Sequence, residues 1–194
     1  MNFAIAGLTA SGKTYQARRL AQNLGLEYIS GSNILLDIAG LRPSEDLFWI
    51  SSNGIQFAEA RTNDHSLDRR VDELLLSMAK SKNDLIFDSI TLPWLYQGND
   101  LVRIYLGANP QARALISLGS RDVMPYSLEE LRELIRIKDE HTLKLFKEMY
   151  GITIGDTSSF DFVIDNSHLS KDETSQALSR FVASIAQPSP LVKR

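Results

Sequence analysis

Short apolar runs alternate along the chain with longer segments in which apolar residues return every three or four positions. The short runs have the length and composition of buried strands and cover residues 2–6, 26–30, 84–89, 101–107 and 160–165. The longer segments have the spacing of amphipathic helices and cover residues 12–24, 32–39, 44–60, 67–80, 127–150 and 170–186. The pattern therefore predicts strands and helices in turn along the whole chain.

Local signals define several helix ends. Gly25 follows the first helix as a C-terminal stop, and Asn109 precedes a proline, which suits the first position of a helix. The segments "SLEE" at 127–130 and "SKDE" at 170–173 have the spacing of capping boxes. They predict a long helix after 127 and a last helix after 170.

Alternating strands and helices predict one α/β domain over residues 1–186, in which helices cover both faces of a parallel sheet. Two helical insertions, residues 31–80 and 109–150, interrupt this alternation. The Pro- and Ser-containing residues 187–194 are expected to form a flexible tail. Parallel sheets bind ligands at the carboxyl ends of their strands. The expected functional segments are therefore residues 7–14, 30–33 and 88–91.

Composition narrows the range of partners. The net charge of −3 gives no basic field, which argues against nucleic acid polymers and anionic membranes as main partners. The chain has no cysteine and no apolar run near the ~20 residues that span a bilayer, and its N-terminus does not resemble a signal peptide. We expect a cytoplasmic protein, and a monomer or a weak homodimer.

The segment "GLTASGKT" at residues 7–14 fits the phosphate-binding pattern G-x-x-x-x-G-K-[ST]. A predicted strand precedes it and a predicted helix follows it, so backbone N–H groups and the helix N-terminus would face phosphate oxygens. Lys13 is expected to contact the β and γ phosphates, and the Thr14 hydroxyl to bind Mg²⁺. The predicted ATP-binding residues are Gly7, Leu8, Thr9, Ala10, Ser11, Gly12, Lys13, Thr14 and Tyr15.

Asp88 ends the third predicted strand, so it is expected at the same edge of the parallel sheet as this loop. Its carboxylate could act on Mg²⁺ or orient the group that accepts the phosphate. An aspartate at this place is also a common turn former that caps the next segment. The residues alone do not choose between these interpretations.

The chain as a whole resembles the cytidylate kinases of the short, archaeal-like type, a family of nucleoside monophosphate kinases. The resemblance rests on "IAGLTASGKTYQARRLAQNLGLEYISGSNIL", "DRRVDELLLSMAK", "DLIFDSITLPWL" and "FKEMYGITIGDTSSFDFVIDNSHLSKDE". It implies the P-loop kinase fold, with strand order 2-3-1-4-5, an acceptor-binding insertion at 31–80 and a mobile lid around 113–140. It also implies MgATP as donor and a nucleoside monophosphate, CMP or dCMP, as acceptor.

The resemblance also implies roles for single residues. Arg121, together with Arg113, would stabilise charge on the transferred phosphoryl group, Lys13 would hold the phosphates, and Asp88 would orient the acceptor or the metal. The residues expected to bind the acceptor are Ser30, Asn33, Arg42, Asp68 and Asp88.

Departures from the family lie at the acceptor site. Leu36 and Ile90 stand where arginines are usual, and the long helix has Lys138, His141, Thr142 and Leu145 in a part that is otherwise arginine-rich. An alignment shifted by one turn would put Arg136 in the place of Lys138. Substitutes could come from Arg42, Arg61, Arg69 or Arg70, each of which is more often a solvated surface residue.

The aromatic residues allow two interpretations. Phe48 and Trp49 could stack on a base or pack in the core, and packing is favoured. Trp94 is expected to pack.

Three functional hypotheses remain open. The first is an ATP-dependent kinase acting on CMP or dCMP. The second is a P-loop kinase acting on a different acceptor, such as a neutral hydroxyl compound, with Asp88 as base. The third is a regulatory protein that binds nucleotide without turnover.

Overall fold

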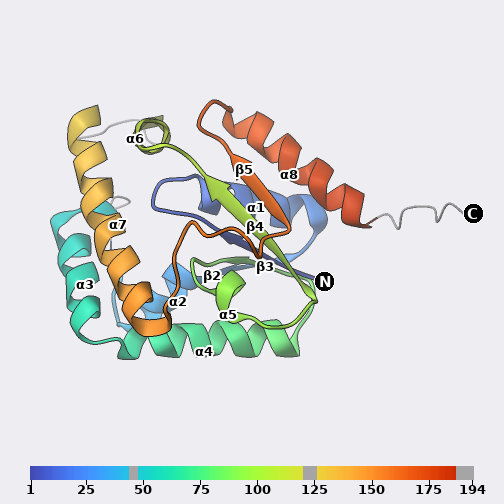
Figure 1. Cartoon of the computed structure of the whole chain (residues 1–194), viewed down its shortest axis with the longest axis horizontal. Coiled ribbons are helices and arrows are strands. Elements are labelled where there is room, and N and C mark those ends of the chain that lie inside the picture. Colours follow the sequence, from blue (N-terminus) through green and yellow to red (C-terminus); the bar gives the residue numbers. More distant parts are fainter. Residues whose placement is uncertain (44–47, 120–125, 187–194) are drawn as a thin grey trace, which may run out of the picture.

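The structure is a computed structural model that describes residues 1–43, 48–119 and 126–186. A five-stranded sheet, with all neighbours parallel and order β2-β3-β1-β4-β5, runs through the molecule (Figure 1). Its strands are β1 (Asn2–Ala6), β2 (Glu27–Ser30), β3 (Leu85–Asp88), β4 (Leu101–Gly107) and β5 (Phe162–Asp165). The predicted α/β class and strand order are confirmed.

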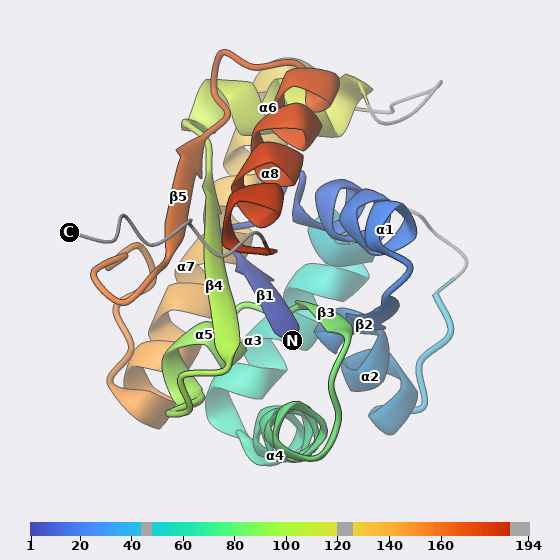
Figure 2. The same ribbon diagram turned by 90° about the vertical axis from the view of Figure 1, so that its right-hand side faces the viewer.

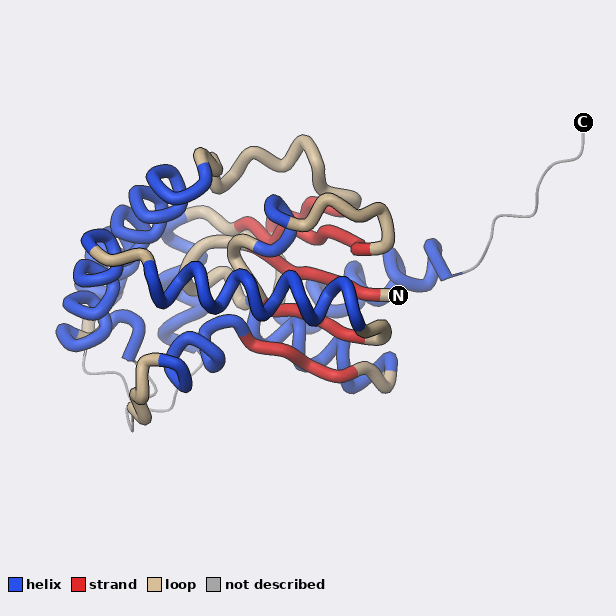
Figure 3. Tube along the Cα trace, turned by 90° about the horizontal axis from the view of Figure 1, so that it is seen from below, coloured by secondary structure: helices blue, strands red, loops and turns tan. Residues whose placement is uncertain are grey.

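Helices cover both faces of the sheet, as Figures 2 and 3 show. On one face, α1 (Lys13–Leu24) and α8 (Lys171–Ala186) pack Leu20 and Leu178 against Ile104 of β4. On the other face lie α2 (Gly31–Ile38), α4 (Ser66–Ser81) and α5 (Leu92–Leu95). The apolar faces of α1 and α4 carry the predicted three- and four-residue spacing, because that spacing places the side chains on one side of a helix.

A further group of helices lies beyond the carboxyl ends of the strands (Figure 1). It contains the 3₁₀ helix η1 (Phe48–Ile50), α3 (Ser52–Asn63), α6 (Pro110–Gly119) and α7 (Leu128–Tyr150). A small apolar cluster joins η1, α6 and α7, and it contains Ile50, Ala114, Leu131 and Ile135. This group therefore faces the edge of the sheet at which the sequence predicts ligand binding.

One predicted helix is wrong in its extent. Residues 44–47 lie outside the described residues, and the remainder of the expected helix 44–60 is divided at Ser51. Ser51 has an extended backbone, and its hydroxyl accepts the N–H of Gly54, so a new helix begins there. A Cβ on Gly54 would lie 1.7 Å from the Phe48 carbonyl oxygen, which shows how closely η1 and α3 pack. The short α5, Leu92–Leu95, was not predicted either.

Both predicted capping boxes are present. The Ser127 hydroxyl accepts the N–H of Glu130, and the Glu130 carboxylate accepts the N–H of Ser127. The pair Ser170 and Glu173 makes the same reciprocal bonds before α8. In the part of the chain that the structure describes, no helix combines the length and apolar character that crossing a bilayer requires.

Candidate active site

The phosphate loop joins β1 to α1 and has the backbone of an anion site. Gly7 and Gly12 have φ values of +152° and +87°, and a Cβ on Gly7 would lie 2.2 Å from the Leu106 carbonyl oxygen. Among the described residues, none caps the start of α1 with its side chain. The first N–H groups of α1 therefore remain available to phosphate oxygens, which also gain from the helix dipole.

Lys13, Thr14 and Asp88 meet at the carboxyl ends of β1 and β3. The Thr14 hydroxyl donates a hydrogen bond to Asp88 Oδ2 at 2.6 Å, and the Tyr28 hydroxyl donates to the same oxygen at 3.1 Å. Lys13 Nζ donates to the Leu8 carbonyl at 2.9 Å, and burial lowers the pKa of Lys13. The hydroxyl of Thr14 and the carboxylate of Asp88 form a pair of hard oxygen ligands, the kind that Mg²⁺ prefers. The donor set thus fits the predicted metal.

A buried ion pair that was not predicted from the sequence contacts the backbone of the phosphate loop. Arg113 of α6 pairs with Asp139 of α7, and the exposed fractions of the two residues are 7% and 5%. Asp139 accepts the Thr9 N–H at 3.2 Å, and Arg113 donates to the Thr9 carbonyl at 3.1 Å. The structure therefore places Arg113 under the loop in contact with its backbone. Arg121 lies outside the described residues.

We predict that Asp139→Asn weakens both folding and donor binding. Removing one partner leaves Arg113 as an uncompensated buried charge, which is expected to cost about 3 kcal/mol in the free energy of unfolding. The loss of the loop contact is expected to weaken ATP binding about tenfold, because small displacements of positioning groups are costly. Urea unfolding and calorimetric titration with ATP measure the two effects.

The matched control is a double variant, Arg113→Met with Asp139→Leu. It removes both charges, so stability should largely return while ATP binding stays weak. Wild-type ATP affinity in the double variant would contradict a positioning role for the pair.

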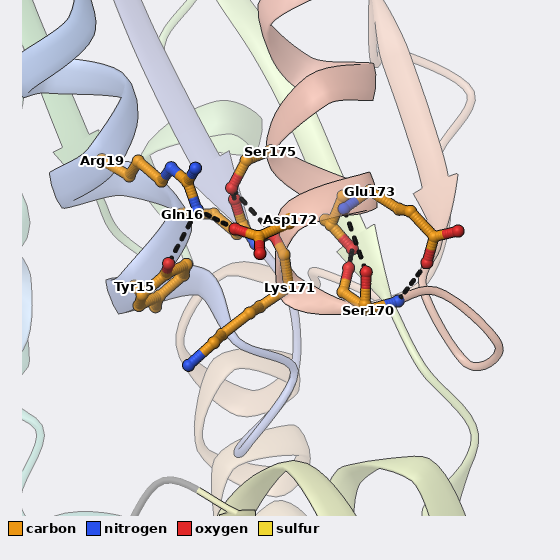
Figure 4. A network of polar contacts seen from close by, with 9 residues as sticks. Tyr15, Gln16, Arg19, Ser170, Lys171, Asp172, Glu173 and Ser175 are labelled. Carbon is orange, nitrogen blue, oxygen red and sulfur yellow. Dashed lines mark hydrogen bonds and ion pairs between the residues drawn. The ribbon is translucent and has the colours of Figure 1, made fainter.

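A network of polar contacts fixes the start of α8 against α1 beside the loop (Figure 4). The buried Gln16 donates to the Lys171 carbonyl at 2.8 Å and accepts from the Ser175 hydroxyl at 2.6 Å. Arg19 contacts both the Tyr15 hydroxyl and the Asp172 carboxylate. These contacts join the first two turns of α1, which follow the phosphate loop, to the start of α8.

A cavity of about 230 Å³ opens beside the phosphate loop. Its wall contains residues from the loop, α2, η1, α3, α4, the end of β3 and α7. The lining residues are Thr9, Ala10, Lys13, Thr14, Gly31, Ser32, Leu35, Trp49, Arg61, Asp68, Val71, Asp72, Leu75, Asp88, Ser89, Ile90, Thr91, Lys138, Thr142 and Phe146. The cavity therefore lies between the donor loop and both helical insertions.

Two cations from the insertions line this cavity. Arg61 is buried, and its Nε donates to Asp68 Oδ2 at 2.8 Å while a second nitrogen contacts the other carboxylate oxygen. Lys138 lies over the Trp49 ring at 5.4 Å and donates to the Thr142 hydroxyl at 3.1 Å. Burial, together with the nearby Arg61, lowers the pKa of Lys138 to about 8. Arg61 and Lys138 thus bring positive charge to a wall from which the usual arginines are absent.

Asp72 is the most unusual group in the cavity wall. It is 5% exposed, and its carboxylate accepts a hydrogen bond from the Thr91 hydroxyl. The Oδ2 atom is buried and has no hydrogen-bond partner among the described residues. Burial raises the pKa of Asp72 to about 6. A buried, partly unsatisfied carboxylate is costly for the fold, so it is a candidate functional group.

We predict a pH-dependent stability difference between the wild type and Asp72→Asn. The folded pKa of about 6 exceeds the unfolded value of 3.8, so the free energy of unfolding falls as pH rises from about 4 to about 6. At about pH 8 the Asn variant should be more stable by about 2–3 kcal/mol, and the difference should shrink toward pH 4. Urea unfolding at several pH values measures it, with the exposed neighbour Glu73→Gln as control. A difference that does not change with pH would contradict the assignment.

The remaining acceptor candidates lie outside the cavity lining. Ser30 caps α2 by accepting the N–H of Asn33 at 3.2 Å. This cap helps to position α2, which lines the cavity, although Ser30 and Asn33 are not lining residues themselves. Arg42 is exposed and contacts Asp37 at 2.7 Å. Arg136, the alternative to Lys138, is exposed and paired with glutamates on α7.

Leu36 and Ile90, the positions at which the resemblance leads one to expect arginines, differ in their relation to the cavity. Ile90 lines the cavity, whereas in the second half of α2 it is Leu35 and not its neighbour Leu36 that does so. Trp94 packs against Tyr105 and Phe160, as predicted, and Phe48 is buried. Trp49 differs from Phe48, because its ring belongs to the cavity wall.

Sequence signals existed for the residues that were missed. Asp72 follows Asp68 by one turn, on the face of the predicted helix that also carries Val71 and Leu75. Asp139 likewise lies on the buried face of α7. A charged residue inside an apolar stripe is rarely buried without a partner. That rule would have marked both positions.

A glycine-rich loop between β1 and α1, with Lys13 and Thr14 at the end of a parallel sheet, defines a P-loop nucleotide-binding protein. The sequence model of the cytidylate kinase-like family matches residues 2–168, and the chain belongs to this family. A cytidylate kinase of Sulfurisphaera tokodaii is 29% identical over 182 residues, which cover 94% of this chain and 95% of that protein. A cytidylate kinase of Pyrobaculum aerophilum is 30% identical over 171 residues, covering 88% and 86% of the two chains.

Solved structures agree on the fold. The shikimate kinase of Bacteroides thetaiotaomicron matches with a TM-score of 0.61 and covers 96% of this chain and 99% of its own. At 11% sequence identity this likeness concerns the fold alone.

Proposed function

We propose that the protein transfers the γ-phosphoryl group of MgATP to a nucleoside monophosphate, with CMP and dCMP as the first candidates. The observation that carries this proposal is the cavity itself. It is lined by Lys13 and Thr14 of the donor loop and by two buried cations of the helical insertions, Arg61 and Lys138. Membership of the cytidylate kinase-like family supports the same acceptor class. A cytoplasmic location and a monomeric or weakly dimeric state remain predictions.

On the donor side, the loop N–H groups and Lys13 hold the β and γ phosphates. Thr14 and Asp88 would hold Mg²⁺, which neutralises charge between the β and γ phosphates when it is bound. Lys13 donates to a loop carbonyl in the structure, and its ammonium would turn to the phosphates when ATP binds. Arg113 and Asp139 keep the loop backbone in shape.

On the acceptor side, Lys138 and Arg61 would attract the monophosphate. Lys138 lines the same cavity as Lys13 and Thr14, and it interacts electrostatically with Lys13, Arg61 and Asp68. A phosphate at Lys138 is therefore close to the donor loop. An oxygen of this phosphate attacks the γ-phosphorus, the bond to the β–γ bridging oxygen breaks, and ADP leaves with that oxygen.

One observation favours a second candidate, a kinase for a neutral hydroxyl compound. The cavity lining contains three carboxylates (Asp68, Asp72, Asp88) and three cations (Lys13, Arg61, Lys138). This balance attracts a phosphate dianion less than a wall of free arginines would. In this case Asp88 would take the proton of the attacking hydroxyl.

Turnover with a defined acceptor panel separates the two candidates. The wild-type protein is incubated with MgATP and CMP, dCMP, UMP, cytidine or a simple polyol, and ADP formation is followed. We expect rapid ADP formation with CMP or dCMP and little with cytidine. Turnover confined to unphosphorylated hydroxyl compounds would support the second candidate and contradict the first.

A further inference from the structure

Asp72 offers a hydrogen-bond acceptor that the transfer reaction itself does not use. Asp72 lines the cavity, and its Oδ1 accepts a hydrogen bond from the Thr91 hydroxyl. Its Oδ2 is buried and has no hydrogen-bond partner in full bonding geometry among the described residues. Lys13 and Thr14 line the same cavity, and the proposed function assigns them, rather than Asp72, to the phosphates. An unused acceptor at this place is suited to the organic part of the acceptor molecule.

We propose that Asp72 determines acceptor specificity by accepting a hydrogen bond from an amino group of the acceptor. The proposal rests on the proposed function, and it assigns the amine-bearing base of a nucleoside monophosphate to this end of the cavity. Cytosine presents an amino group at the place where uracil presents a carbonyl oxygen. Asp72 therefore selects CMP or dCMP against UMP.

The chemistry of a carboxylate explains the selection. An ionised carboxylate only accepts hydrogen bonds, so it binds an amine and repels a carbonyl oxygen. Thr91 fixes the orientation of the Asp72 side chain by donating to its other oxygen. A buried polar group that loses its partner carries a desolvation penalty, so UMP would leave Oδ2 unpaired.

The groups around the Asp72 carboxylate do not neutralise it with an ion pair. The groups that act on its carboxylate are Thr91, Tyr150, Asp68 and Arg61. Arg61 is already paired with Asp68 through both carboxylate oxygens. The Tyr150 hydroxyl also acts on this carboxylate as a hydrogen-bond donor. Within the described residues, no cation forms an ion pair with Asp72, and no donor lies in full hydrogen-bond geometry to its Oδ2.

The experiment compares CMP with UMP on the wild type, Asp72→Asn and the control Glu73→Gln. Glu73 is the exposed neighbour of Asp72 on α4 and lies outside the cavity lining. The wild type should prefer CMP in kcat/KM by at least about 100-fold. The Asn amide can donate to a carbonyl, so the preference should fall by at least about 30-fold in Asp72→Asn and stay unchanged in Glu73→Gln.

Direct binding of CMP and UMP by calorimetry accompanies the kinetics. The specificity proposal would be overturned if Asp72→Asn lowered kcat/KM and affinity equally for CMP and UMP. A wild type that does not distinguish CMP from UMP would overturn it as well. If the wild type phosphorylates neither nucleotide, the proposed function fails. The calorimetric affinities for CMP and UMP then test the role of Asp72 independently of turnover. A CMP preference in binding that Asp72→Asn removes would then support Asp72, and equal or absent binding would overturn its role.

Discussion

Lys13→Ala is expected to lower kcat/KM for ADP formation at least about 10³-fold. Lys13 is the one side chain of the loop that carries a full positive charge to the transferred group, and such charges contribute several powers of ten to phosphoryl transfer. Its ammonium donates to the Leu8 carbonyl and interacts electrostatically with Asp88 and Asp139, so it already lies at the end of the sheet where the loop is. The steady-state rate of ADP formation with saturating acceptor measures the loss.

The control for this substitution is Lys80→Ala. Lys80 is an exposed lysine in the last turn of α4, outside the cavity lining. It should retain wild-type activity. Activity of Lys13→Ala within about tenfold of the wild type would contradict the role of the loop as donor site.

Lys138→Met is the second large effect we expect. Burial disfavours the charged lysine, so methionine should fold at least as well, while kcat/KM for CMP should fall about 100-fold. ATP affinity should hardly change, because the loop stays intact. Arg132→Met, an exposed arginine on the same helix, is the control.

The pH profile gives an independent test of Lys138. With a pKa of about 8, the ammonium loses its proton as pH rises through that value, and kcat/KM for CMP should fall there. Lys138→Arg should remove this fall, because a guanidinium stays charged. A profile that is the same in both proteins would rule out Lys138 as the group that titrates.

Much of the fold follows from local patterns. The strands and their alternation with helices could be read from apolar runs, and the donor loop from the order of Gly7, Gly12, Lys13 and Thr14. The strand order came from the family resemblance, because spacing alone does not state which strands are neighbours. The helix break at Ser51 was missed, because a serine cap inside an apolar segment competes with helix continuation only when tertiary packing supports it.

The acceptor site was less predictable from sequence. Arg42 and Arg61 look alike in the sequence, yet one pairs with Asp37 in solvent and the other is buried against Asp68. Asp72 and Lys138 reach the same cavity from helices far apart in the chain. Such an arrangement depends on how α4 and α7 pack across the strand ends, and local spacing does not contain that information.

The central claim is that the acceptor binds in the cavity that joins the phosphate loop to Lys138, Arg61 and Asp72. A crystal structure with a bisubstrate compound, adenosine and cytidine joined through a polyphosphate bridge, tests it most directly. We expect the bridge to run from the loop past Lys138, with the cytosine amine in hydrogen-bond distance of Asp72 Oδ2. A cytidine half bound outside this cavity, with the loop occupied, would contradict the claim.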